Sequence, residues 1–173
     1  DVLDPCPATW DWAHLTRYLP DDRDASILDA GCGNGYYCGL LAQRGYRDVT
    51  GIDLFDRLDT RGAFRYQKNS IDAIDLPDES VDFLFSLSVI YYLPDPMRGL
   101  REFHRVLKPG ALLLFTSHTK HSLFTWKRQI WRAFGKAPHL KDVRFRSTGS
   151  YLRMLHRAGL EVLLTEAGIL AQD

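Results

Sequence analysis

Three alternate glycines near the start of the chain have the spacing with the clearest chemical meaning. Residues 25–30 form a short, mostly apolar run, Gly31, Gly33 and Gly35 follow it, and apolar positions resume at helical spacing over residues 36–44. This order predicts a buried strand, a tight turn and a helix. Glycine lets a backbone approach a ligand closely, and the first N–H groups of a helix lack partners, so we predict a ligand-binding loop.

Two carboxylates near the glycine loop indicate which charge a ligand of this loop can carry. Asp29 stands at the mouth of the glycine loop, and Asp53 closes a second apolar run at residues 48–53. Dinucleotide-binding loops have the spacing G-x-G-x-x-G, but here the third glycine comes one residue early and Tyr36 holds its expected position. A phosphate charge ~4 Å from Asp29 would cost roughly 1 kcal/mol in water and about 4 kcal/mol at an effective dielectric of 20. The pattern favours a ligand with an ammonium group over a diphosphate.

Further motifs follow in order between residue 27 and about residue 168. They are Asp29-x-Gly31-x-Gly33-x-Gly35, Gly51-Ile52-Asp53, Asp72-Ala73-Ile74-Asp75-Leu76-Pro77, Val81-Asp82-Phe83, Leu93-Pro94-Asp95-Pro96 and Arg105-Val106-Leu107-Lys108-Pro109-Gly110. With this set the chain resembles the class I S-adenosylmethionine-dependent methyltransferases, and within them the type 11 methyltransferase domains. Each motif is common alone, and the specificity lies in their order.

Predicted strands and helices alternate along the chain. Strands are expected at residues 25–30, 48–53, 63–67, 81–86, 111–116 and 160–165. Helices are expected at residues 9–19 and 36–44, after Asp95 and Pro96, and from Ser147 or Thr148 to Gly159. The alternation predicts an α/β fold with a doubly wound, mostly parallel sheet and a site at the carboxyl ends of its strands. The resemblance implies a Rossmann-like methyltransferase fold with a last, antiparallel strand. The chain ends at Asp173, where that strand should begin, so two alternatives stay open: the strand is missing, or the edge of the sheet is built differently.

The resemblance also implies a cofactor, S-adenosyl-L-methionine, with S-adenosyl-L-homocysteine as its product. Asp29 would attract the ammonium group, and Asp53 would accept hydrogen bonds from the ribose hydroxyls, worth roughly 1.5 to 3 kcal/mol each. Asp72 would meet the adenine amino group. The alternatives are a solvated carboxylate for Asp53 and a turn-forming residue for Asp72. The full predicted cofactor site comprises Asp29, Gly31, Cys32, Gly33, Gly35, Tyr37, Asp53, Leu54, Ile71, Asp72, Ala73 and Leu87.

Candidate catalytic residues follow the fourth and fifth predicted strands. Methyl transfer is an in-line displacement, so the protein mainly positions donor and acceptor, which can supply roughly 7 to 11 kcal/mol. A hydroxyl acceptor needs a general base, and His118 and His121 are the best placed. The ring of Tyr91 is a candidate for contact with the sulfonium. Packing for Tyr91 and loop exposure for the two histidines are the alternatives, and no metal site is predicted.

A basic, aromatic segment at residues 117–146 is expected to be a lid-like insertion. It carries eight basic side chains against one acidic side chain, and apolar residues recur in it at helical spacing: Leu123, Trp126, Ile130, Trp131 and Phe134. Three interpretations stay open: a lid whose charges meet an anionic acceptor, a peripheral contact with a membrane surface, and a core helix with solvated charges. Nucleic acid is a less favoured partner because the basic residues are confined to this segment.

Length and composition fit a single domain over residues 1–173. The chain has 173 residues, is 45% hydrophobic and carries no formal net charge, which is enough for one buried core. No apolar run approaches the ~18 residues of a membrane span, and residues 1–4 lack the features of a secretory signal. Cys6, Cys32 and Cys38 form no C-x-x-C pair, which favours a reducing compartment and a cytoplasmic location.

These observations predict a methyltransferase that acts on a small-molecule acceptor or a lipid- or sugar-linked acceptor, at oxygen rather than nitrogen. Two other classes stay open. An NAD(P)-binding oxidoreductase would share the order of strand, loop and helix, but the loop spacing and the absence of a Tyr-x-x-x-Lys pair disfavour it. A catalytically silent S-adenosylmethionine-binding module would fit the missing last strand.

Overall fold

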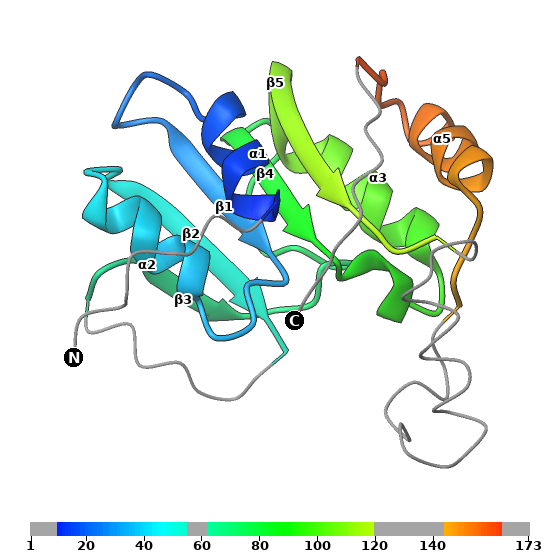
Figure 1. Ribbon diagram of the computed structural model, residues 1–173, viewed down its shortest axis with the longest axis horizontal. Coiled ribbons are helices and arrows are strands. Elements are labelled where there is room, and N and C mark those ends of the chain that lie inside the picture. The colour runs from blue at the N-terminus through cyan, green and yellow to red at the C-terminus, as the bar shows by residue number, and fades with distance from the viewer. Residues whose placement is uncertain (1–9, 55–61, 120–143, 164–173) are drawn as a thin grey trace.

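Within the described residues, five parallel strands form one sheet (Figure 1). The computed structural model describes residues 10–54, 62–119 and 144–163. The strand order is β3-β2-β1-β4-β5, so the chain starts in the middle, moves to one edge and then crosses to the other side. This is the doubly wound arrangement that the sequence predicts. The strands are β1 (Ser26–Ala30), β2 (Asp48–Asp53), β3 (Arg65–Lys68), β4 (Val81–Leu87) and β5 (Leu107–Thr116).

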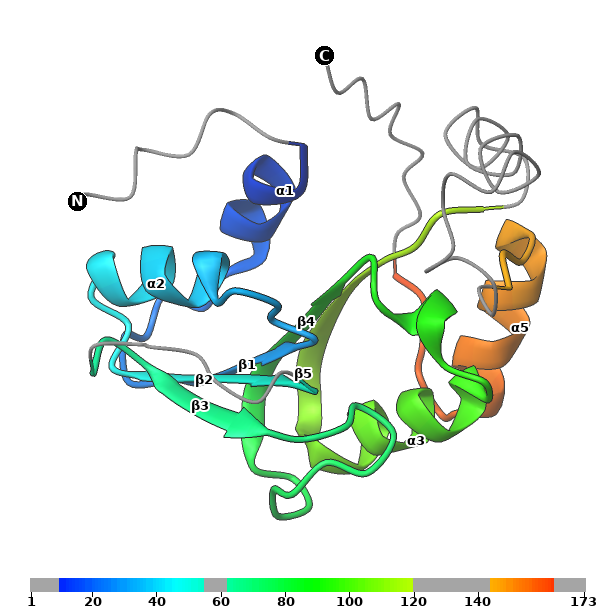
Figure 2. The same ribbon diagram turned by 90° about the horizontal axis from the view of Figure 1, so that it is seen from below.

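Helices cover both faces of this sheet (Figure 2). Two of them, α1 and α2, pack on one face, and α3 and α5 pack on the other. Strand β1 contributes to both cores because its side chains alternate: Ile27 packs with the first pair of helices, whereas Leu28 packs with the second pair. None of the described helices is long and apolar enough to cross a membrane. The helical elements are α1 (Trp10–Tyr18), α2 (Tyr36–Gln43), the 3-10 helix η1 (Ile90–Tyr92), α3 (Pro96–Val106) and α5 (Thr148–Arg157).

Local sequence explains where the helices begin. Asp95 accepts a 3.0 Å hydrogen bond from the Met97 N–H group, and Pro96 occupies the first helical position of α3. Ser147 caps α5 in the same way, through the N–H group of Ser150. Both caps are as the sequence predicts.

The second half of the sheet departs from the prediction in two places. β5 begins at Leu107 rather than at residue 111, because Leu107 pairs with Val81 before an irregular stretch that brings Leu112 opposite Phe83. The predicted strand at residues 160–165 is wrong for residues 160–163, which form no strand, and residues 164 and 165 lie outside the described residues. Leu160 packs against the edge of the core, whereas Val162 and Leu163 are exposed, Leu163 to 74%.

One arginine holds the connection between β3 and β4, which contains no helix. The Arg105 guanidinium on α3 donates to the carbonyls of Ile74 at 2.7 Å and Leu76 at 2.9 Å, and it pairs with Asp78 at 2.6 Å. It also pairs with Glu102, whose carboxylate accepts the N–H group of Ile74 at 2.8 Å. The predicted Asp72 motif therefore sits at the start of a loop that is tied to α3.

Candidate functional site

The glycine loop after β1 is tied to the end of β2. The N–H groups of Gly31 and Cys32 both donate to the Ile52 carbonyl, at 2.8 and 3.0 Å, and the Gly35 N–H group donates to the Cys32 carbonyl at 2.9 Å. Gly35 then begins α2 with a φ of +71°, a conformation that glycine adopts without strain. The backbone geometry thus forms the tight turn that the glycine spacing predicts.

The Asp53 carboxylate links this loop to the loop after β2. One oxygen accepts the N–H group of Gly33 at 2.8 Å, and the other accepts the N–H group of Leu54 at 2.7 Å. Each carboxylate oxygen has a further lone pair, so Asp53 can still accept hydroxyl groups of a ligand. The side chain of Leu54 is 66% exposed beside it.

Two of the glycines serve different purposes. Among the described residues, a Cβ atom at Gly33 would meet no heavy atom within 4 Å, so this position is open on that side. A Cβ atom at Gly31 would lie 2.5 Å from Cγ2 of Val89, so this glycine is required by the fold itself. The open space lies where the sequence prediction puts the methionine part of the cofactor.

Asp29 lies beneath the loop rather than at its open mouth. Its side chain is 2% exposed and accepts a 3.4 Å hydrogen bond from the Cys38 thiol. Burial raises the pKa of Asp29 to about 8; the hydrogen bond from Cys38 opposes this rise, and the nearby Asp53 charge adds to it. The protein therefore holds much of this carboxyl in the protonated form near neutral pH.

The predicted adenine segment after β3 already has partners. Ser70 donates a hydrogen bond to one oxygen of Asp72, and Arg98 lies 4.0 Å from the other. Ala73 donates to the Ser70 carbonyl at 3.1 Å in a turn, and Ile71 is buried in the core. The turn-forming interpretation of Asp72 is thus realised, while its contact with adenine stays a prediction.

Aromatic stacking and a strained residue complete the predicted cofactor edge. Tyr37 stacks on Trp12 of α1 with ring centroids 5.8 Å apart. Leu87 ends β4, and Ser88 after it has a φ of +59° and donates to Thr116 of β5 through its N–H group at 3.0 Å. A non-glycine residue with positive φ often marks a functional site.

Beyond β4 and β5, a group of aromatic rings forms around Tyr91. This residue is 2% exposed, and its ring centroid lies 4.6 Å from that of Tyr92, 5.5 Å from His118 and 5.4 Å from Phe145. The structure thus brings together two predicted catalytic residues, Tyr91 and His118. Phe145 joins them from the chain just before α5.

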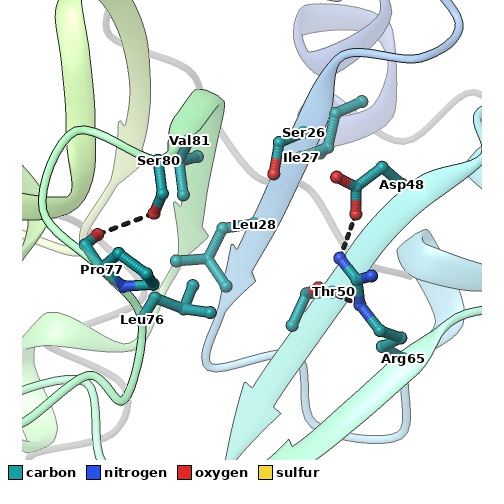
Figure 3. A pocket seen from close by; sticks show the side chains of 10 residues that line it. All are labelled: Ser26, Ile27, Leu28, Asp48, Thr50, Arg65, Leu76, Pro77, Ser80 and Val81. Atoms are coloured by element: carbon teal, nitrogen blue, oxygen red, sulfur yellow. Dashed lines mark hydrogen bonds and ion pairs between the residues drawn. The ribbon is translucent and has the colours of Figure 1, made fainter.

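Two hollows of the described surface lie away from the carboxyl edge of the sheet. A cavity of about 220 Å³ opens at the amino ends of β1, β2 and β4, on the side of the sheet that faces α3, and Figure 3 shows its lining. Arg65 lines one side of it, in contact with Asp48 and Thr50 (Figure 3). A second hollow, of about 710 Å³, lies along α5 and the residues after it. The candidate site therefore rests on loop geometry, with neither hollow at the carboxyl edge.

The chain matches the methyltransferase domain family over residues 10–165. The chain belongs to this family. Malonyl-[acyl-carrier protein] O-methyltransferase of Serratia marcescens is 35% identical over 102 residues, which cover 56% of this chain and 40% of that protein. tRNA U34 carboxymethyltransferase of Saccharophagus degradans is 33% identical over 116 residues, which cover 61% of this chain and 36% of that protein. The chain thus spans about two fifths of the length of these relatives.

A solved S-adenosylmethionine-dependent methyltransferase from Mesorhizobium loti shares the fold, with a TM-score of 0.69 and 24% identity. The match covers 86% of this chain and 80% of that structure. The class I methyltransferase resemblance and the fold class are confirmed, and the oxidoreductase alternative finds no support in the matched family. The type 11 subdivision stays a prediction.

Sequence reasoning on the methyltransferase domain missed three residues at the site. Cys38 contacts Asp29 at the base of the glycine loop, Val89 lies against Gly31, and Ser88 follows Leu87 and donates to Thr116 of β5. Cys38 was visible as a polar group on the predicted helix after the loop, whereas no sequence signal marks the other two. His121 and residues 120–143 of the predicted lid lie outside the described residues.

Proposed function

We propose that this methyltransferase domain binds S-adenosyl-L-methionine and transfers its methyl group to oxygen of a small-molecule acceptor or of a lipid- or sugar-linked acceptor. The observation that carries the proposal is the glycine loop, held by Asp53 and open at Gly33. A loop of backbone that no side chain covers is what close approach of a ligand requires. The family match supports the same cofactor.

Three residues fit the cofactor by their chemistry. Asp53 offers free lone pairs to the two ribose hydroxyls, and Gly33 leaves room for the methionine part. Asp29 supplies a buried carboxyl on the side of the ammonium group. The cofactor supplies a methyl group on a sulfonium, and the protein contributes orientation, worth roughly 7 to 11 kcal/mol.

His118 is the candidate general base for a hydroxyl acceptor. It follows β5 and its ring lies against that of Tyr91, which is buried and can fix the orientation of the imidazole. The name of one relative, malonyl-[acyl-carrier protein] O-methyltransferase, supports a carboxyl or hydroxyl oxygen on a carrier-linked acceptor. The name of the other, tRNA U34 carboxymethyltransferase, keeps nucleic acid open as a partner.

The basic segment at residues 117–146 is proposed as the lid over the acceptor. Replacing Lys127, Arg128 and Arg132 together with glutamine should change S-adenosylhomocysteine affinity by less than about twofold, because the glycine loop holds the cofactor. Acceptor turnover should fall, and the loss should shrink as salt is raised. Loss of binding to anionic vesicles would favour the membrane contact instead, and neither effect would favour a core helix.

Calorimetric titration with S-adenosylhomocysteine and turnover of methyl-labelled cofactor over an acceptor panel test the whole proposal. Micromolar binding and label transfer are expected, and His118→Asn should lower turnover by roughly 10²- to 10⁴-fold with little change in binding. Binding without transfer to any acceptor would favour the catalytically silent module. No binding at all would overturn the proposed function.

A further inference from the structure

Cys38 is a buried group that the proposed mechanism does not use. It lies in the first turns of α2, is fully buried, and directs its thiol at Oδ2 of Asp29 from 3.4 Å. Among the described residues no other donor to the Asp29 carboxyl occurs. One thiol therefore sets the orientation of the acidic residue at the base of the glycine loop.

The neighbouring strand is shaped to admit this thiol. Gly51 of β2 lies beside Asp29 of β1 in the sheet register. A Cβ atom at Gly51 would lie 2.9 Å from the sulfur of Cys32 and 3.0 Å from the sulfur of Cys38. The two sulfur atoms thus fill the place of a side chain at Gly51, and any larger residue there would push α2 and the loop away from Asp29.

Two titratable groups face the Asp29 carboxyl, and a third lies behind the first. The Cys38 thiol approaches from α2, the Asp53 carboxylate from the end of β2, and the Cys32 thiol lies against Cys38 from the loop. Burial raises the pKa of Asp29 to about 8, and the charge on Asp53 adds to the rise. A cation brought to the loop favours the charged carboxylate and so reverses this shift.

We propose that Cys38 is a positioning residue for the cofactor site, and that binding of an ammonium group expels the proton from the Asp29 carboxyl which its thiol holds in place. The inference rests on the proposed function, since the ammonium group is that of the cofactor. In this step the O–H bond of Asp29 breaks, the proton passes to the buffer, and the ammonium charge balances the carboxylate. The Cys38 thiol keeps its own proton and donates to the same oxygen.

Calorimetric titration of the full chain with S-adenosylhomocysteine, in two buffers of different ionisation enthalpy, measures the proton directly. Release of roughly 0.9 proton per ligand is expected at pH 7, because a group of pKa about 8 is mostly protonated there. Affinity should rise about tenfold per pH unit and level off above pH 8. Asp29→Asn should release none, which also corrects for titration of the ligand's own amino group.

Two controls separate the ammonium group from the remainder of the ligand. 5′-Methylthioadenosine has no ammonium group and should bind without proton release. Asp24→Asn removes an exposed carboxylate in the turn before β1, where Asp24 pairs with Arg47, and should leave the proton count unchanged. Equal proton release by both ligands, or no release by the parent protein, would overturn the inference. Failure of S-adenosylhomocysteine to bind the parent at all would instead overturn the proposed function.

Substitution of Cys38 distinguishes positioning from packing. Cys38→Ala removes the donor and should weaken S-adenosylhomocysteine binding about tenfold, while the midpoint of the pH profile rises. Cys38→Ser keeps a hydroxyl donor and should restore affinity to within about threefold. A packing role predicts the opposite order, because serine places a polar group in an apolar site. Serine binding no better than alanine would overturn the role of Cys38.

Discussion

The carboxyl edge of the sheet has two halves that are built by different means. Around β1 and β2, backbone N–H groups fix the glycine loop to the Ile52 carbonyl and to the Asp53 carboxylate. Around β4 and β5, side-chain rings pack around Tyr91. The first half is thus specified mainly by backbone hydrogen bonds and one carboxylate, and the second by packed side chains.

This difference fits our proposal that the half around β1 and β2 binds the cofactor, and that the half around β4 and β5 binds the acceptor, which differs between relatives. A loop fixed mainly by backbone hydrogen bonds depends little on most side chains around it, whereas a group of packed rings can be reshaped by single substitutions. We therefore expect changes in the first half to affect cofactor binding and changes in the second to affect stability and acceptor choice. Four predictions test this division.

The largest effect is expected at the open glycine. Gly33→Val should abolish measurable S-adenosylhomocysteine binding, a loss of more than about 100-fold, because a β-branched side chain would fill the ligand's space. The protein should still fold, with a penalty of about 1 to 3 kcal/mol from the φ of +56°. Titration calorimetry and circular dichroism check the two parts. Unchanged affinity would remove the loop from the site.

Asp53→Ala should weaken S-adenosylhomocysteine binding by roughly 100-fold, since two charged hydrogen bonds to ribose are lost together with the anchor of Gly33. The matched control is Asp48→Ala at the other end of the same strand, where the carboxylate pairs with Arg65. That change should alter affinity by less than about twofold. Similar losses in both variants would mean that strand β2, rather than the ribose contact, carries the effect.

In the aromatic half, Tyr91→Ala should lower the free energy of unfolding by roughly 3 kcal/mol, because a buried ring with three ring neighbours is removed. S-Adenosylhomocysteine affinity should stay within about threefold while the protein remains folded. Tyr92→Ala, at a ring that is 46% exposed, should cost less than about 1 kcal/mol. Urea unfolding measures the free energy of unfolding, and calorimetry measures the affinity. Loss of S-adenosylhomocysteine binding in Tyr91→Ala would contradict the separation of roles between the two halves.

The smallest effect concerns Asp29 in the ligand-free protein. Folding raises the pKa of Asp29 from 3.8 to about 8. Between about pH 4 and pH 8 the folded state therefore keeps a proton that the unfolded state has already released. This contribution to stability is full below pH 4 and is lost as pH rises towards 8. Asp29→Asn lacks the titration, so its stability relative to the parent should increase by at least about 1 kcal/mol from pH 5 to pH 8. A gap that stays constant over this range would contradict the shift.

The sequence predicts the glycine loop and several helix starts well. The predicted strand at residues 48–53 and the helix start at residue 36 agree with β2 and α2, and the Asp95 and Ser147 caps are found where predicted. Glycines and caps act through local backbone geometry, which a sequence pattern records directly. Asp53 lies beside the glycine loop because β1 and β2 pair in parallel, so that the two strands end at the same edge of the sheet.

Other features depend on partners far away in the chain and leave no local pattern. Residues 160–163 have the composition of a strand, but a strand also needs a neighbour, and Leu163 is exposed instead. The position of Asp29 beneath the loop depends on Cys38 and on the space at Gly51. The contact of Val89 with Gly31 joins residues from two different strand ends. The spacing of residues in the sequence predicts none of these contacts.

The hydrogen bonds from Arg105 to the segment between β3 and β4 limit how the sequence of that segment can diverge. Its guanidinium reaches two main-chain carbonyls, those of Ile74 and Leu76, which every amino acid possesses. Side chains along that segment can therefore be substituted with little loss of stability, provided that Arg105 and the length of the segment are kept. A single inserted residue would move both carbonyls out of reach at once. We therefore expect homologues to vary in amino-acid sequence between β3 and β4 but to keep the length of this segment. Relatives with an insertion there should also lack the arginine at position 105.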